Sequence, residues 1–295
     1  MSERGAPPVT ITDVQTILTA PNGIRLVVVK VLTSEPGLYG LGCATFTQRP
    51  LAVATAIDEY LKPFVLGRDV DRIEDIWQAL YVSSYWRSGP VLNNAMSGLD
   101  QALWDIKGKR AGMPLYQLFG GKCREAVPVY THASGASPTE VEERVRAFMA
   151  QGFRYIRVQM GIPGLSTYGS RGGEAIPALD PAQTRTWEPT PYVHSVPKLL
   201  EHLRVAVGED VELLHDVHER IPPIQGVWLA KAVEPYRLFF LEDLFAPEDI
   251  EYFRMVRAQC ATPIAMGELF VNQAEYVPLI RDRLIDFIRV HISDI

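Results

Sequence analysis

The sequence predicts an α/β protein with an α+β domain over residues 1–120 and a (β/α)-barrel domain over residues 121–295. Two observations lead to this fold class. The first part of the chain shows strand patterns followed by helical patterns, whereas the second part alternates short apolar runs with helical stretches. Such alternation is typical of a parallel sheet with right-handed crossovers. Six consecutive strand runs of this kind favour a barrel over an open sheet.

The first domain begins with strand-like runs. Two runs rich in β-branched residues, over 10–19 and 24–33, flank a Pro-Asn-Gly turn, and a third short run covers 38–46. Two segments with helical spacing of apolar residues follow, over 51–67 and 91–112. These elements predict a small sheet covered by helices.

The second domain is built from repeated strand and helix patterns. The expected strands cover residues 127–132, 155–159, 211–216, 238–243, 263–268 and 286–292. The expected helices cover residues 138–152, 196–208, 222–234 and 247–259. Strands that are apolar on both faces fit a sheet covered by helices.

One connection interrupts this alternation. Residues 161–192 are rich in Gly and Pro and show no clear periodicity. Long irregular loops inside compact domains are usually binding loops or disordered segments. Because this one follows a strand, we expect it at the carboxyl end of the sheet, where α/β active sites lie. An insertion without function is the alternative.

The composition narrows the function classes. The chain has 295 residues, a net charge of −6 and no dominant block of Lys or Arg, so nucleic acid is not the expected partner. Cys43, Cys123 and Cys260 are odd in number and widely spaced, so they indicate neither a disulfide framework nor a CxxC metal site. Neither a secretory signal nor an apolar run of membrane-spanning length is present. The sequence predicts a soluble cytoplasmic protein.

Three acids follow the strand pattern in phase. Asp216, Glu242 and Glu268 each end a strand run, 26 residues apart, which is one strand–helix unit. Acids at the ends of adjacent parallel strands converge, and their mutual repulsion is relieved by a hard cation such as Mg²⁺. The alternative is that each acid caps a helix or forms a separate ion pair.

Further residues are candidates for acid–base chemistry. His218 lies two residues after Asp216 and faces the same way if the strand continues. Arg157 lies within a strand run and Tyr168 on the loop after it. The arginine either pairs with a structural acid or lowers the pKa of a nearby tyrosine, which is otherwise too high for a base at neutral pH.

Other polar residues on these strands have separate expected roles. His132 ends the first barrel strand and Arg289 lies on the sixth, and both are candidates to contact an anionic ligand. His215 and Asp243 are each offset by one residue from a predicted metal ligand. We therefore expect both to point toward the helix layer.

Several motifs resemble those of a known family. SGLDQALWDIKGKRAGMPLYQLFGG (97–121) resembles the helix that joins the two domains of the enolase superfamily. HDVHER, FFLED and AMGELF resemble the metal-bearing strands of its mannonate dehydratase subgroup, which includes proteins named as starvation-sensing. RVQMGIPGLSTYG and YTHASG resemble that subgroup's arginine–tyrosine element and histidine strand. The resemblance spans nearly the whole chain.

The resemblance implies a capping domain over a modified (β/α)-barrel and one Mg²⁺. It implies dehydration of an acid sugar, D-mannonate or D-gluconate, through an enediolate to 2-keto-3-deoxy-gluconate. Asp216, Glu242 and Glu268 would then bind the metal. Tyr168 with Arg157 would abstract the proton next to the carboxylate, and His218 would protonate the departing hydroxyl. The subgroup further implies a homo-oligomer.

Two departures from the family pattern bear on activity. Thr47 stands where the family typically shows a substrate-contacting Asn, and it is either a substrate contact or an ordinary loop residue. The chain ends at HISDI, whereas the family continues into two further strands, so we expect a barrel truncated after its sixth strand. These departures support an alternative hypothesis, in which the protein retains the metal site but has lost this catalysis. A metal-assisted barrel hydrolase is a third possibility.

Overall fold

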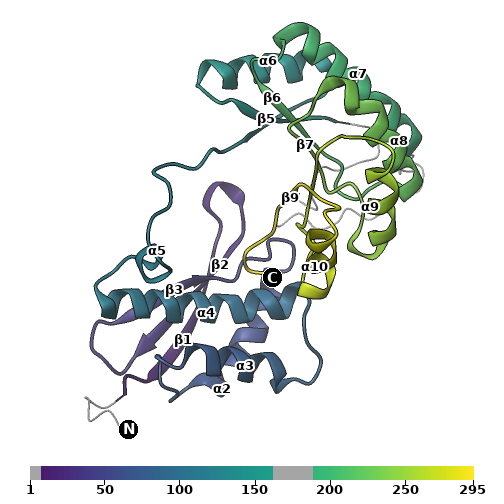
Figure 1. Cartoon of the computed structure of the whole chain (residues 1–295). Helices are drawn as coiled ribbons and strands as arrows, with labels where there is room; N and C mark the ends of the chain where they lie inside the picture. Colours follow the sequence, from purple (N-terminus) through teal and green to yellow (C-terminus); the bar gives the residue numbers. More distant parts are fainter. Residues whose placement is uncertain (1–7, 162–188) are drawn as a thin grey trace, which may run out of the picture. The chain divides into compact units, whose positions relative to one another are not determined.

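The computed structural model describes residues 8–161 and 189–295, which form two compact units (Figure 1). The first unit comprises residues 8–125 together with Ile292–Ile295, and the second comprises the rest of the described chain. The division after Glu125 compares with a predicted boundary at residue 120. Within the described residues, no helix is long and apolar enough to cross a membrane.

The first unit is an antiparallel sheet covered by helices. Its strands are β1 (Ile11–Thr19), β2 (Leu26–Thr33) and β3 (Tyr39–Cys43), in that order across the sheet. Its α-helices are α1 (Pro50–Thr55), α2 (Lys62–Val65), α3 (Ile73–Ser83), α4 (Pro90–Ala111) and α5 (Leu115–Leu118). A short 3₁₀ turn (Pro21–Gly23) joins β1 and β2, and a π-helical turn (Ala56–Leu61) joins α1 and α2.

Helix α4 approaches the sheet closely enough to require glycine on β3. A Cβ added to Gly40 would lie 1.9 Å from the carbonyl oxygen of Ala102, and one added to Gly42 would lie 2.0 Å from that of Gly98. Under this contact, Val29 of the central strand is fully buried. The small residues on both elements therefore set the distance between helix and sheet.

The second unit contains a six-stranded parallel sheet in sequential order. Its strands are β4 (Thr131–Gly135), β5 (Tyr155–Met160), β6 (Glu212–Asp216), β7 (Phe240–Glu242), β8 (Ile264–Met266) and β9 (Phe287–Ile288). Its α-helices are α6 (Pro138–Ala150), α7 (Pro189–Val207), α8 (Pro223–Val233), α9 (Ile250–Arg257) and α10 (Gln273–Arg281), with 3₁₀ turns at Glu234–Tyr236 and Pro247–Asp249. The predicted α+β domain followed by a parallel, barrel-like α/β domain is confirmed.

Helices α6 to α9 follow one another along one side of this sheet (Figure 1). Local signals begin two of the unit's helices. The Ser137 side chain accepts a hydrogen bond from the Glu140 amide at the start of α6, and Asn272 forms a capping box with Glu275 at the start of α10.

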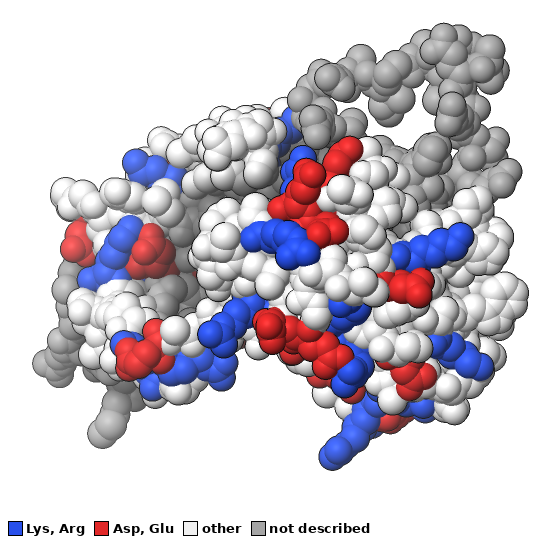
Figure 2. Space-filling view, turned by 90° about the horizontal axis from the view of Figure 1, so that it is seen from above, with Lys and Arg blue, Asp and Glu red and all other residues white. Residues whose placement is uncertain are grey.

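On the face of the molecule in Figure 2, acidic and basic side chains lie interspersed, and neither sign forms a continuous field.

The strand register brings the carboxyl ends of the central strands together. Asp216 at the end of β6 pairs with Glu242 at the end of β7, and Glu242 pairs with Ala265 of β8. β8 ends at Met266, so Glu268 lies two residues beyond the strand rather than at its predicted end. Strand β4 also begins at Thr131 and not at the predicted residue 127.

Candidate active site

Four carboxylates gather at the carboxyl end of the parallel sheet. One oxygen from each of Asp216, Glu242, Asp243 and Glu268 lies within 4.8 Å of the others. Asp216 and Glu242 are buried, whereas Glu268 is partly exposed. The structure thus brings together the three acids that the spacing of the strand runs predicted.

The expectation that Asp243 points toward the helix layer is wrong. At the end of β7 the backbone turns into the left-handed region, with φ of +44° at Asp243, so strand alternation no longer applies. Its Oδ1 accepts a hydrogen bond from the Gly267 amide at 3.0 Å, and its Oδ2 lies 3.3 Å from Arg289 Nη1. His215 does lie toward the helices, with its Nε2 2.8 Å from the Tyr192 hydroxyl of α7.

Two arginines compensate part of the negative charge. Arg157 of β5 is 1% exposed, and its Nη1 lies 2.5 Å from Asp216 Oδ2 and 3.2 Å from Glu242 Oε1. Arg289, which follows β9, places Nε 2.5 Å from Glu242 Oε1 and Nη1 3.0 Å from Glu268 Oε2. When all four carboxylates are ionised, two guanidinium groups leave two negative charges, which one divalent cation would neutralise.

Glu242 has an oxygen that the described residues leave without a hydrogen-bond partner. Its Oε2 is buried and unpaired, whereas its Oε1 contacts both arginines. Burial, together with the charge of Asp216, raises the pKa of Glu242 well above its ordinary value. Buried carboxylate oxygens in a group of this size are the ligands that Mg²⁺ prefers, so the residues fit a hard divalent cation.

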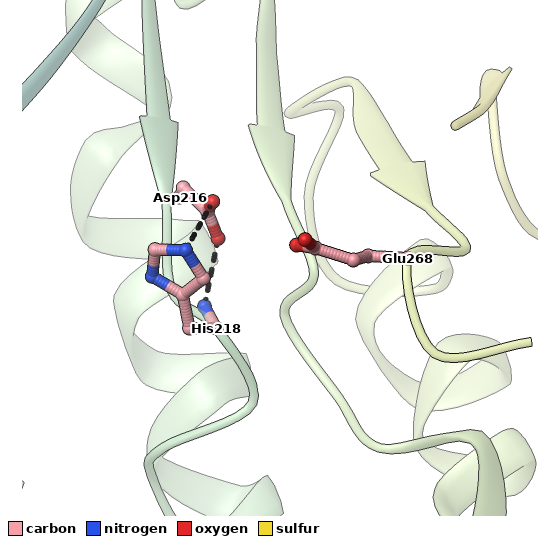
Figure 3. A group of neighbouring side chains, drawn as sticks. All are labelled: Asp216, His218 and Glu268. Carbon is pink, nitrogen blue, oxygen red and sulfur yellow. Dashed lines mark hydrogen bonds and ion pairs between the residues drawn. The ribbon is translucent and has the colours of Figure 1, made fainter. Parts of the chain in front are cut away.

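His218 contacts Asp216 at the end of β6 (Figure 3). Its Nε2 lies 2.8 Å from Asp216 Oδ2, and its backbone amide donates to Asp216 Oδ1 at 2.8 Å. Burial acts to raise the pKa of Asp216, but the His218 hydrogen bond and the charge of Arg157 hold it below the ordinary value. The strand does not continue to His218 as expected. A left-handed turn, with φ of +55° at His218, directs the ring to the aspartate instead.

The remaining predicted residues lie at different places. His132 of β4 is opposite Arg157, with 3.3 Å between its Nδ1 and Arg157 Nη2. Partial burial and the charge of Arg157 lower the pKa of His132 to about 4, so its ring is neutral at pH 7. Thr47 lies in the first unit between β3 and α1, where its hydroxyl contacts Gln48 Oε1 at 2.8 Å. Tyr168 lies outside the described residues.

Comparisons with known proteins match both parts of the chain. Residues 4–120 match the family model of the N-terminal domain of mandelate racemase and muconate lactonizing enzyme, and residues 140–295 match the enolase C-terminal domain-like model. The chain is 57% identical to the D-galactonate dehydratase family member RspA of Pantoea ananatis, covering 97% of this chain and 71% of the relative. A D-galactonate dehydratase family member of Musicola paradisiaca is 55% identical over the same shares. The chain belongs to the enolase superfamily, in its D-galactonate dehydratase family.

Solved structures agree with this assignment. An enolase from Pantoea ananatis with bound D-gluconate and magnesium is 56% identical, with a TM-score of 0.88 over 97% of this chain and 72% of that one. A member of the enolase superfamily from Salmonella Typhimurium is 25% identical, with a TM-score of 0.80 over 97% and 74%. The predicted superfamily, its acid-sugar dehydratase group and the two-domain enolase-type fold are confirmed. The relatives are named after D-galactonate, whereas the sequence motifs indicated the mannonate subgroup.

Proposed function

We propose that this member of the family is a Mg²⁺-dependent dehydratase of an acid sugar, with D-gluconate or D-mannonate as substrate. The observation on which this depends is the cluster of four carboxylates with a residual charge that one divalent cation would balance. The 56% identical Pantoea structure, which contains D-gluconate and magnesium, supports both the metal and the substrate class.

Asp216, Glu242 and Glu268 are the proposed metal ligands. Both oxygens of Asp243 already have partners, the Gly267 amide and Arg289, so Asp243 is better suited to hold Arg289 than to bind the cation. Glu242 in contrast keeps a buried oxygen without a partner among the described residues. When bound, Mg²⁺ would supply positive charge next to the carboxylate oxygens of the substrate.

Two proton transfers are required of the chain's own residues. The proton next to a carboxylate is very weakly acidic, so the reaction needs a base beside a site that stabilises negative charge. We assign this base to Tyr168, supported by Arg157, on the family resemblance. His218, as the imidazolium with a proton on both ring nitrogens, would protonate the hydroxyl that leaves as water and return to the neutral ring, because its Nε2 faces the acid cluster.

Three residues are proposed to bind substrate. Arg289 and His132 lie beside the acid cluster, where the arginine offers donors that suit a carboxylate or hydroxyl. Thr47 is the third proposed contact to the sugar, on the family resemblance alone. A hydroxyl is shorter than an amide and presents a different set of donors and acceptors, so Thr47 is the residue where sugar specificity departs from the family pattern.

Turnover of defined substrates tests the proposal. The protein is incubated with Mg²⁺ and, separately, with D-mannonate, D-gluconate and D-galactonate, and the 2-keto-3-deoxy product is assayed. We expect product from at least one acid sugar and none after chelation of the metal. Absence of product across the panel in Mg²⁺ would contradict the assignment.

A second candidate function is ligand binding without dehydration. The threonine at position 47, where the resemblance implies an asparagine, favours it, because the loss of an amide donor–acceptor pair removes a substrate contact. Calorimetric binding of Mg²⁺ and D-gluconate without any product would support this function, and efficient turnover would exclude it.

A further inference from the structure

A buried glutamine lies beside Asp216 and His218. Gln159 follows Arg157 by two residues on β5, so both side chains point to the same face of the sheet, and Gln159 is only 6% exposed. Its Nε2 lies 3.2 Å from the backbone oxygen of Asp216 and 3.4 Å from His218 Nδ1. Gln159 therefore contacts one ring nitrogen of His218, while the other faces Asp216 (Figure 3).

These contacts settle which way the Gln159 amide points. A backbone carbonyl oxygen only accepts hydrogen bonds, so the group that faces the Asp216 oxygen must be the NH₂ end of the amide. The second hydrogen of the same NH₂ group is then available to His218 Nδ1. A nitrogen that accepts this hydrogen bond cannot itself hold a proton.

We propose that Gln159 is a metal-selectivity residue, which keeps the proton of the neutral His218 ring on Nε2 and thereby prevents this nitrogen from binding a metal. The negative charge of Asp216, whose Oδ2 lies 2.8 Å from Nε2, favours the same tautomer. A metal ligand nitrogen must be unprotonated, so the ring in this tautomer presents an N–H to the site. The proposal concerns the resting protein and depends on the proposed metal function of the acid cluster.

The consequence is a choice between two possible ligand sets. Asp216, His218 and Glu268 would form a mixed nitrogen and oxygen set, which suits Zn²⁺ or Co²⁺. Asp216, Glu242 and Glu268 offer oxygen alone, which suits Mg²⁺. Because Gln159 removes Nε2 from the available ligands, the site retains only its oxygen set.

Replacing Gln159 by Glu should move the proton of the neutral His218 ring from Nε2 to Nδ1. The carboxylate would accept a hydrogen bond from Nδ1–H, which leaves Nε2 unprotonated, and a carboxylate behind a histidine is the arrangement that supports zinc ligands. The added charge strengthens the binding of every cation, so the informative quantity is the ratio of Zn²⁺ to Mg²⁺ affinity. We expect this ratio to rise by roughly 10- to 100-fold in Gln159→Glu, the usual range of effects from groups behind a metal ligand.

Metal binding alone measures the ratio, with no turnover required. Zn²⁺ and Mg²⁺ affinities come from chelator competition and calorimetry, and Co²⁺ absorption reports whether nitrogen joins the ligands. Gln225→Glu is the control, because this substitution makes the same charge change outside the acid cluster. The Gln225 amide contacts Thr190 of α7. An unchanged ratio in a folded Gln159→Glu protein would overturn the proposal.

The parental protein provides a second measurement, which does not depend on any variant folding. The chain has six histidines, and His218→Asn identifies the signals of His218 in ¹⁵N NMR spectra of the metal-free protein. In alkaline buffer, where imidazoles are neutral, we expect Nε2 to be protonated and Nδ1 not. A ring protonated on Nδ1 would refute the proposal, whereas failure of the acid-sugar assay would refute only the dehydratase function.

Discussion

At the scale of the residue, Glu242 is the proposed ligand whose removal is most informative. We expect Glu242→Gln to weaken Mg²⁺ binding by roughly 100-fold or more and to abolish acid-sugar turnover, because one anionic oxygen ligand is lost. Since burial raises the pKa of Glu242, a neutral amide there should leave the melting temperature unchanged or higher. Calorimetry with Mg²⁺ and thermal unfolding followed by circular dichroism measure both effects.

The same substitution at the start of the neighbouring strand, β6, is its control. Glu212 begins this strand and is exposed, so Glu212→Gln should alter neither Mg²⁺ affinity nor turnover. Loss of the folded far-UV spectrum in Glu242→Gln would show instead that the carboxylate mainly holds Arg157 and Arg289 in place.

Tyr168 is tested by the removal of its ionisable oxygen alone. If Tyr168 abstracts the proton next to the carboxylate, Tyr168→Phe should lower both turnover and exchange of that proton with deuterated solvent by at least ~100-fold. Mass spectrometry of recovered substrate measures the exchange. An exchange rate equal to that of the parental enzyme would assign the base to another residue.

The site residues differ in how far the sequence could reveal them. Asp216, Glu242 and Glu268 follow from strand spacing, because parallel strands end at a common edge. Asp243 does not, since its position depends on a left-handed turn that strand alternation cannot anticipate. Gln159 had a usable signal, because side chains two residues apart on a strand lie on the same face, which places Gln159 beside Arg157.

At the scale of the element, the contact between β3 and α4 should tolerate no side chain. We expect Gly42→Ala to destabilise the first unit by about 3 kcal/mol or more, because the new Cβ would lie 2.0 Å from the Gly98 carbonyl oxygen and the backbones would have to separate. Chemical denaturation monitored by circular dichroism measures the change.

Gly23→Ala separates this steric effect from the conformational preference of glycine. Gly23 has no atom within 4 Å of an added Cβ, but its φ is +78°, so alanine there should cost only about 1 kcal/mol. Equal effects at Gly23 and Gly42 would show that the close approach of α4 does not determine stability.

The errors in the predicted elements have identifiable causes. Helix α7 begins at Pro189, earlier than the predicted residue 196, and it contains Pro197, a residue type that usually marks a boundary. Helix α10 was not predicted, although Asn272 and Glu275 form a capping box that the sequence displays. Helix α3 was not predicted either, although Ile73, Ile76 and Leu80 are buried at helical spacing and the helix contains no proline.

At the scale of the whole molecule, the acid cluster links stability to pH and to divalent cations. Burial and the charge of Asp216 raise the pKa of Asp243 to about 7 and that of Glu242 to about 8. Unfolded carboxyls titrate near pH 4. Between about pH 4 and the raised pKa values, these carboxyls keep protons in the folded protein that they have lost in the unfolded chain. The free energy of unfolding therefore falls as pH rises through this range.

A cation bound among these carboxylates would relieve the repulsion that develops as they ionise. We therefore expect Mg²⁺ to raise the melting temperature of the second unit more at about pH 8.5 than at about pH 5.5, since protons compete for the same oxygens at low pH. Differential scanning calorimetry with Mg²⁺ and with chelator, at matched ionic strength, measures the difference. Glu242→Gln should lose most of the gain at the higher pH. An equal gain at both pH values, or one that survives this substitution, would place the stabilising cation outside the acid cluster.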